Sequence, residues 1–143
     1  MFICLGTNDF GRATADIITD LTEIITSIHA YSSDIRIGVW SPPPRSLTGN
    51  GSLVNRDVIL GIANAIYTAF NWEETNKIYV VPVTLNVDPY HDFPMESVYV
   101  SAENHDYQML VTTDNVHPSD AGYAKMADMI YSYIKYFGSL DAT

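Results

Sequence analysis

The sequence predicts an α/β domain in which amphipathic helices cover both faces of a parallel β-sheet. Short, nearly continuous apolar strands alternate with helical segments along the chain, and strands of this kind are typical of parallel sheets that are buried on both faces. The length of 143 residues suits a single domain that spans residues 1–143. Ligands bind beyond the carboxyl ends of the strands in such sheets. Polar residues that follow a strand are therefore the first candidates for a functional site.

The first half of the chain supplies two strands and a helix. Residues 2–5 are apolar and predict a strand that ends at Gly6. Residues 14–30 predict a helix, because their apolar side chains recur at helical spacing. These side chains are Ile17, Ile18, Leu21, Ile24, Ile25 and Ile28. Residues 35–40 predict the second strand, and the prolines at 42–44 end it because proline cannot donate to a strand ladder.

The second half adds two helices, one strand and a long connection. A helix is expected from about Asn55, with Ile59, Ile62, Ala63, Ile66 and Phe70 on its buried face. Residues 77–83 predict the third strand, and residues 84–113 form an irregular region with a small hairpin from 97–100 and 108–112. The last helix is expected to begin after a cap at His117 or Ser119 and to stop at Gly138. Its predicted face is Tyr123, Ala127, Ile130, Ile134 and Phe137.

The charge and the cysteine content exclude several classes of function. Acidic residues outnumber Lys and Arg by 17 to 7, which gives a net charge of −10. This balance argues against nucleic acid and anionic membranes as partners, because both require a basic surface. It leaves neutral or cationic small molecules and polysaccharides open. No apolar stretch is long enough to predict a membrane span. The one cysteine, Cys4, lies in an apolar strand and is expected to be a buried, inert thiol.

Asp114 and His117 are the strongest candidates for chemistry. An Asp that orients a His is the base half of a nucleophilic triad, and the two residues are three positions apart just before the last helix. Asn8 follows the first strand and is a candidate donor to an oxyanion. All the loops that follow strands lie on one rim of the sheet, so Asn8 and the Asp–His pair are expected to converge. The alternative is a helix-capping Asp beside a surface His, with Asn8 as an ordinary turn residue.

Two further sets of candidate residues lie in the long connection after the third strand, joined in one case by Trp40 from the end of the second strand. One is a group of carboxylates and imidazoles that would suit a divalent metal, namely Asp88, His91, Asp92, His105 and Asp106. It lacks a helix-spaced ligand signature, and a solvated loop is the favoured interpretation, so no metal is predicted. The other set is aromatic: Trp40, Tyr90 and Phe93, with Tyr99 and Tyr107, would form a wall for an apolar or sugar substrate or would pack in the core.

Two motifs in this sequence resemble blocks of the SGNH (GDSL-type) hydrolase family. They are Gly6-Thr7-Asn8-Asp9 after a strand and Asp114-Asn115-Val116-His117-Pro118 before the final helix, and the continuation from Ser119 to Tyr123 is also similar. The resemblance implies a five-stranded, flavodoxin-like three-layer α/β/α sandwich and ester hydrolysis without a metal or cofactor. It further implies that Asn8, with Gly6, serves the oxyanion side, that His117 is the general base, and that Asp114 orients His117.

The sequence departs from the family pattern at the nucleophile. The family's Gly-Asp-Ser-Leu block and its second, glycine-bearing block have no counterpart here, and the first two strands and first helix of the fold are expected to be absent. Five serines are available as substitutes: Ser41, Ser46, Ser97, Ser101 and Ser119. None lies in a glycine-flanked elbow between a strand and a helix. The prediction is therefore that this chain contains no nucleophile.

The sequence thus predicts a serine esterase of the SGNH type that lacks its nucleophilic serine, with an acetylated carbohydrate as the favoured substrate. The alternative is a non-catalytic binding or structural module of the same fold in a larger assembly. The strand from Phe2 to Leu5 is expected to be an exposed sheet edge that pairs with a second copy or a companion chain. The compartment stays open, since secreted, surface and virion-associated locations all fit the sequence.

Overall fold

The protein folds around three parallel strands in a computed structural model that describes residues 1–9, 11–46, 52–103 and 105–141, without the side chains of residues 52–55. The strands are β1 (Phe2–Ile3), β2 (Ile37–Trp40) and β3 (Ile78–Val81), in the order β1-β2-β3. Phe2 pairs with Gly38, and Val39 pairs with Val80. The predicted α/β fold with a parallel sheet is confirmed.

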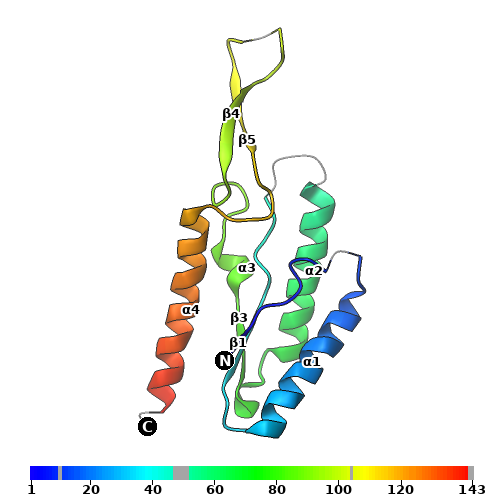
Figure 1. Ribbon diagram of the computed structural model, residues 1–143, viewed down its shortest axis with the longest axis vertical. Helices are drawn as coiled ribbons and strands as arrows, with labels where there is room; N and C mark the ends of the chain where they lie inside the picture. Colours follow the sequence, from blue (N-terminus) through cyan, green and yellow to red (C-terminus); the bar gives the residue numbers. More distant parts are fainter. Residues whose placement is uncertain (10, 47–51, 104, 142–143) are drawn as a thin grey trace.

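Helices cover both faces of this sheet. The helices α1 (Thr14–Tyr31) and α2 (Ser52–Phe70) lie on one side of the strands, and α4 (Asp120–Leu140) lies on the other (Figure 1). On the α4 side, the Tyr133 hydroxyl donates to the Val80 carbonyl at 2.8 Å, and the Phe137 ring stacks on Phe2 at 5.8 Å between centroids. None of the described helices is both long and apolar enough to cross a membrane.

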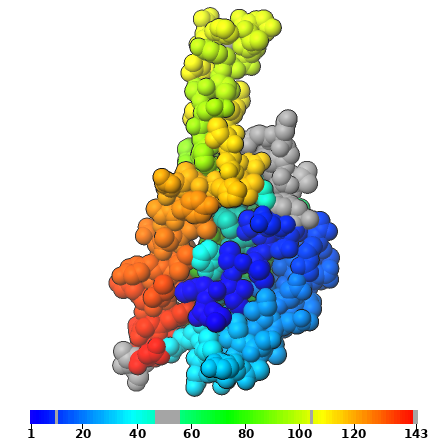
Figure 2. Space-filling model, in the orientation of Figure 1, coloured from blue at the N-terminus to red at the C-terminus, as the bar shows by residue number. Residues whose placement is uncertain are grey.

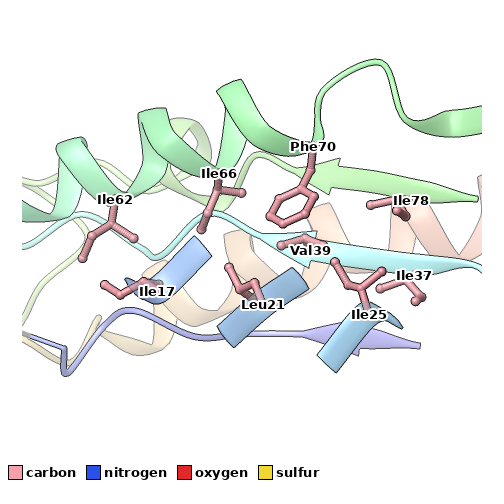
Figure 3. Close-up of a cluster of buried hydrophobic side chains, with 9 residues drawn as sticks. All are labelled: Ile17, Leu21, Ile25, Ile37, Val39, Ile62, Ile66, Phe70 and Ile78. Atoms are coloured by element: carbon pink, nitrogen blue, oxygen red, sulfur yellow. The ribbon is translucent and has the colours of Figure 1, made fainter. Parts of the chain in front are cut away.

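The main core lies between the sheet and the helices α1 and α2 (Figure 3). Its nine buried side chains are Ile17, Leu21, Ile25, Ile37, Val39, Ile62, Ile66, Phe70 and Ile78. Isoleucine is only a moderate helix former, so the packing of these faces holds both segments helical. Full burial of one such side chain contributes about 1.5–3 kcal/mol. The predicted buried face of α2 is confirmed, although the helix begins at Ser52 rather than near Asn55.

The last helix differs from its prediction in two respects. Ser119 caps it, as expected, by accepting a hydrogen bond from the Gly122 N–H at 3.3 Å. The helix then runs through Gly138 to Leu140, so the stop predicted at Gly138 is wrong. Its sheet-facing residues are Met126, Met129, Tyr133 and Phe137, whereas most of the predicted face points to solvent. Two adjacent apolar faces run along α4, and periodicity alone does not tell them apart.

The connection between β3 and α4 contains a short helix and a projecting hairpin. The helix α3 (Val83–Asn86) occupies the end of the predicted third strand, and a single 3₁₀ turn, η1 (Glu74–Asn76), precedes β3. The strands β4 (Met95–Tyr99) and β5 (Gln108–Thr112) pair antiparallel, as predicted. Figures 1 and 2 show this hairpin extending away from the layered body.

The first strand, β1, forms one edge of the sheet. Among the described strands it pairs with β2 alone. Cys4, just beyond β1, is exposed, so the prediction of a buried thiol is wrong. The reason is that nothing in the described chain covers the outer side of β1. Beside this edge lies an open groove of about 800 Å³, whose apolar lining includes Leu5 from the end of β1 and Ile24 and Tyr31 from α1.

Candidate active site

Asp114 and His117 form a tight, self-contained turn between β5 and α4. The carboxylate Oδ1 of Asp114 accepts hydrogen bonds from the backbone N–H of Val116 at 2.8 Å and of His117 at 2.9 Å. Its second oxygen, Oδ2, lies 2.8 Å from Nδ1 of His117. Asp readily makes such side-chain to backbone bonds two and three residues along the chain. The spacing of three residues is therefore what places the carboxylate against the imidazole.

This turn fixes the proton positions of the imidazole. Hydrogen bonds from the two backbone N–H groups, and then from the His117 side chain, lower the pKa of Asp114 to about 2. Asp114 is therefore ionised at neutral pH and acts only as an acceptor, so Nδ1 of His117 must donate. Neutral His117 then carries its lone pair on Nε2, which has no partner among the described residues. With 69% of its side chain exposed, His117 is accessible to a substrate.

The pKa of Asp114 gives a direct test of this geometry. We expect its carboxyl carbon to titrate near pH 2 in an NMR experiment, below the ordinary value of 3.8. Because the folded-state pKa is the lower one, the stability that the turn contributes is present above pH 4 and is lost as pH falls towards 2. In the His117→Ala variant the pKa should stay below 3.8, since the backbone bonds are its largest cause. A wild-type pKa of 3.8 or above would contradict the turn.

Asn8 lies in a sharp turn that follows β1. Gly6 is buried there with a backbone φ of +104°, a conformation that residues with a side chain rarely adopt. A Cβ at Gly6 would also approach the Ile62 side chain to 2.9 Å. The Asp9 N–H closes the turn onto the Gly6 carbonyl at 3.4 Å. Asn8 itself is exposed at this turn, and its side-chain amide makes no hydrogen bond to another described residue.

Arg45 and Ser46 join the Asn8 turn to the Asp114 turn; sequence reasoning missed Arg45 and considered Ser46 only as a nucleophile. Nη2 of Arg45 donates to the Thr7 carbonyl at 3.1 Å. The Ser46 N–H donates to the Asn115 carbonyl at 3.2 Å. The two turns are therefore linked through consecutive residues that follow β2. The available signal is an arginine directly after the proline run at the carboxyl end of a strand.

The candidate serines occupy other places in the structure. Ser41 is fully buried and accepts from the Thr84 N–H at 3.0 Å. Ser46 is also fully buried, with its hydroxyl 2.6 Å from that of Thr112. Ser119 caps α4, and Ser97 and Ser101 belong to the projecting hairpin. No described serine makes a hydrogen bond to His117, and the position of the nucleophile stays a prediction.

The three aromatic candidates for a substrate wall are not equivalent. Phe93 is 2% exposed and packs beside Val81 and Met126 in the core under α4, so its predicted place in a substrate wall is wrong. Trp40 packs against the same cluster, and its indole Nε1 is buried without an acceptor among the described residues. Of these three, Tyr90 is 51% exposed and available to a ligand, and the other two candidates, Tyr99 and Tyr107 on the hairpin, are exposed as well.

The acidic and histidine-rich connection forms ion pairs. Asp88 and His91 repeat the geometry of the Asp114 turn, with Oδ2 2.8 Å from Nδ1. Asp92 is 3% exposed and pairs with Nζ of Lys125 on α4 at 2.7 Å. Within the described part of the chain, no three His, Cys, Asp or Glu side chains converge in a way that could hold a metal ion.

A layered α/β fold with an Asp–His pair at the carboxyl rim of its sheet is an arrangement also found in hydrolases that use histidine as a general base. The comparison with protein families gives a narrower assignment. The model of the GDSL-like lipase/acylhydrolase family matches residues 1–125, and the chain belongs to that family. The search of curated proteins found no match.

Proposed function

We propose that His117 is the general base of an ester hydrolase and that Asp114 orients it. The observation that carries the proposal is the turn that holds Nδ1 of His117 against an ionised carboxylate and leaves Nε2 exposed. Membership of an acylhydrolase family supports ester hydrolysis as the class of reaction. The links from Arg45 to Thr7 and from Ser46 to Asn115 support a common site for Asn8 and His117.

The proposed reaction proceeds in two acyl transfers. Nε2 of His117 removes the proton from a serine hydroxyl as its oxygen attacks the ester carbonyl carbon. The side-chain amide of Asn8 donates to the oxyanion that forms. The C–O bond to the alcohol then breaks, and His117 returns the proton to the leaving oxygen. Water repeats the sequence on the acyl-serine, which releases the acid and restores the serine.

The nucleophilic serine of this proposal comes from a polypeptide segment that pairs with the free edge of β1. A strand added there in parallel would end beside the turn of Gly6 to Asn8. It would be covered by α1 on one face, across the groove lined by Ile24, and by the second apolar face of α4 on the other. Tyr123 and Ile134 on that face are 47% and 51% exposed. Such a strand would bury surface that is otherwise open to solvent.

We propose an acetylated carbohydrate as the substrate. The net charge of −10 disfavours anionic headgroups and polyanions. Short acyl groups suit a site whose Asp–His turn lies at the surface rather than at the end of a deep apolar cavity. Exposed aromatic rings such as Tyr90 provide surfaces on which sugar rings can stack.

Two measurements should distinguish the chain from the completed protein, by which we mean the chain together with the proposed serine-bearing segment. We expect the chain of 143 residues to leave p-nitrophenyl acetate unhydrolysed above the background of free imidazole, and the completed protein to hydrolyse it. We also expect Cys4 to react with a water-soluble thiol reagent in the native chain and to be protected in the completed protein. Esterase activity of the chain alone, or equal Cys4 reactivity in both proteins, would contradict the proposal.

A non-catalytic binding module is the second candidate function. The observation that favours it is the projecting hairpin, which exposes several large apolar side chains: Tyr99, Val100, Tyr107, Met109 and Leu110. Such a patch away from the core is typical of a protein contact. If the completed protein shows no turnover of acetyl esters while these side chains bind a partner, the module is the better description.

A further inference from the structure

Arg45 is buried between the two turns of the proposed site. Only 8% of its surface is exposed, and its Nη2 holds the Thr7 carbonyl at 3.1 Å. The next residue, Ser46, is fully buried and binds both Asn115 through its N–H and Thr112 through its hydroxyl. One short segment after β2 thus fixes the backbone before Asn8 and the backbone around Asp114.

We propose that Arg45 is a positioning residue, which sets the orientation of the Thr7–Asn8 peptide and thereby the direction of Asn8 relative to His117. The inference rests on the proposed function. The carbonyl and the following N–H of a trans peptide point in opposite directions. The hydrogen bond from Arg45 to the Thr7 carbonyl therefore directs the Asn8 N–H away from Arg45. It also fixes the rotation of the peptide group that precedes the Asn8 Cα, and thereby the direction in which the Asn8 side chain extends.

An arginine suits this position better than a neutral donor. A guanidinium has five N–H donors in one rigid plane, so one N–H can bind a carbonyl while the directions of the other four are fixed by the same plane. Burial lowers the pKa of Arg45, and the nearby charge of Asp114 opposes that shift. The Asp114 carboxylate thus favours the charged form of the Arg45 guanidinium. We expect loss of the Arg45 guanidinium to displace Asn8, the proposed oxyanion donor. A displacement of about 1 Å can lower the rate about 100-fold.

The kinetic test compares Arg45→Met and Arg45→Lys in the completed protein. For p-nitrophenyl acetate we expect Arg45→Met to lower kcat by roughly 10- to 100-fold with little change in KM, because the donor acts in the transition state. Arg45→Lys should recover part of this loss, since one ammonium donor can still reach a carbonyl. Arg56→Met is the control for loss of a guanidinium, because Arg56 is bonded to its neighbour Asp57 at 2.7 Å and to neither turn among the described residues. An unchanged kcat in Arg45→Met would overturn the proposal.

An NMR measurement on the chain separates positioning from general stabilisation. In Arg45→Met the carbonyl carbon of Thr7 should shift as it loses its donor. The chemical shift of the Asn115 carbonyl carbon should not change, because the Ser46 N–H still donates to this carbonyl. Shifts at both carbonyls, or at neither, would overturn the proposal. The two hypotheses fail separately: turnover that survives His117→Ala refutes the proposed function, whereas loss of turnover in His117→Ala with full kcat in Arg45→Met refutes only the role of Arg45.

Discussion

Replacing His117 with alanine should lower kcat/KM for p-nitrophenyl acetate by at least about 10³-fold in the protein that carries the serine-bearing segment. The substitution removes Nε2, the proposed proton acceptor, and leaves Asp114 held by the Val116 N–H. The protein should therefore fold as before while its serine keeps its proton. Asp114→Asn should cost less than His117→Ala but more than 10-fold, because an amide no longer fixes the imidazole tautomer.

The chain provides its own control for this experiment. His91 sits in an Asp–His turn with the same spacing, and its Nδ1 lies at the same 2.8 Å from Asp88. His91 is also exposed, so His91→Ala removes an equivalent side chain from an equivalent local structure. We expect the kcat/KM of His91→Ala to be unchanged. A large loss in His91→Ala, or turnover that survives His117→Ala, would show that the base has been assigned to the wrong turn.

Gly122→Ala should produce the largest loss of stability among single-methyl substitutions in α4. A Cβ at Gly122 would lie 2.5 Å from the carbonyl oxygen of Asp92 and 2.7 Å from Cβ of Pro118. The first of these is backbone, so the start of the helix must move. We expect the free energy of unfolding to fall by about 2–3 kcal/mol, as in other overpacked sites, despite the better helix propensity of alanine. Urea denaturation followed by circular dichroism measures this change.

Gly138→Ala is the matched substitution at the other end of the same helix. A Cβ at Gly138 would meet nothing within 4 Å. We therefore expect a gain of up to about 1 kcal/mol from helix propensity alone. If Gly122→Ala and Gly138→Ala change the free energy of unfolding in the same direction, the result would contradict the close contact between Gly122 and the Asp92 backbone.

Much of the fold could be predicted because the apolar pattern and the burial agree. Ile59, Ile62 and Ile66 lie on one helical face, and each is buried by the sheet. The pattern failed at α4, where two neighbouring faces are apolar and only one meets the described sheet. It failed again at Cys4, because an apolar strand predicts burial on both sides and gives no sign of which strand forms the sheet edge.

The candidate site was predictable where its geometry is local. The carboxylate and imidazole of Asp114 and His117 meet because three residues separate them, and no long-range contact is needed. Arg45 was not predictable, since its partner Thr7 lies 38 residues away and only folding brings the two together. Phe93 was misassigned for a related reason. An aromatic ring in an irregular segment looks the same in sequence whether it faces solvent or a core.

The root of the hairpin separates two parts of the protein that can change independently. The Thr113 N–H donates to the Pro94 carbonyl at 3.0 Å, and Ser46 holds Thr112. These bonds clamp β4 and β5 where they leave the body, one or two residues before Asp114. Sequence beyond the clamp can be lengthened, shortened or exchanged without moving the Asp–His turn. The hairpin tip is therefore the segment whose length and sequence can change with the least effect on the Asp–His turn.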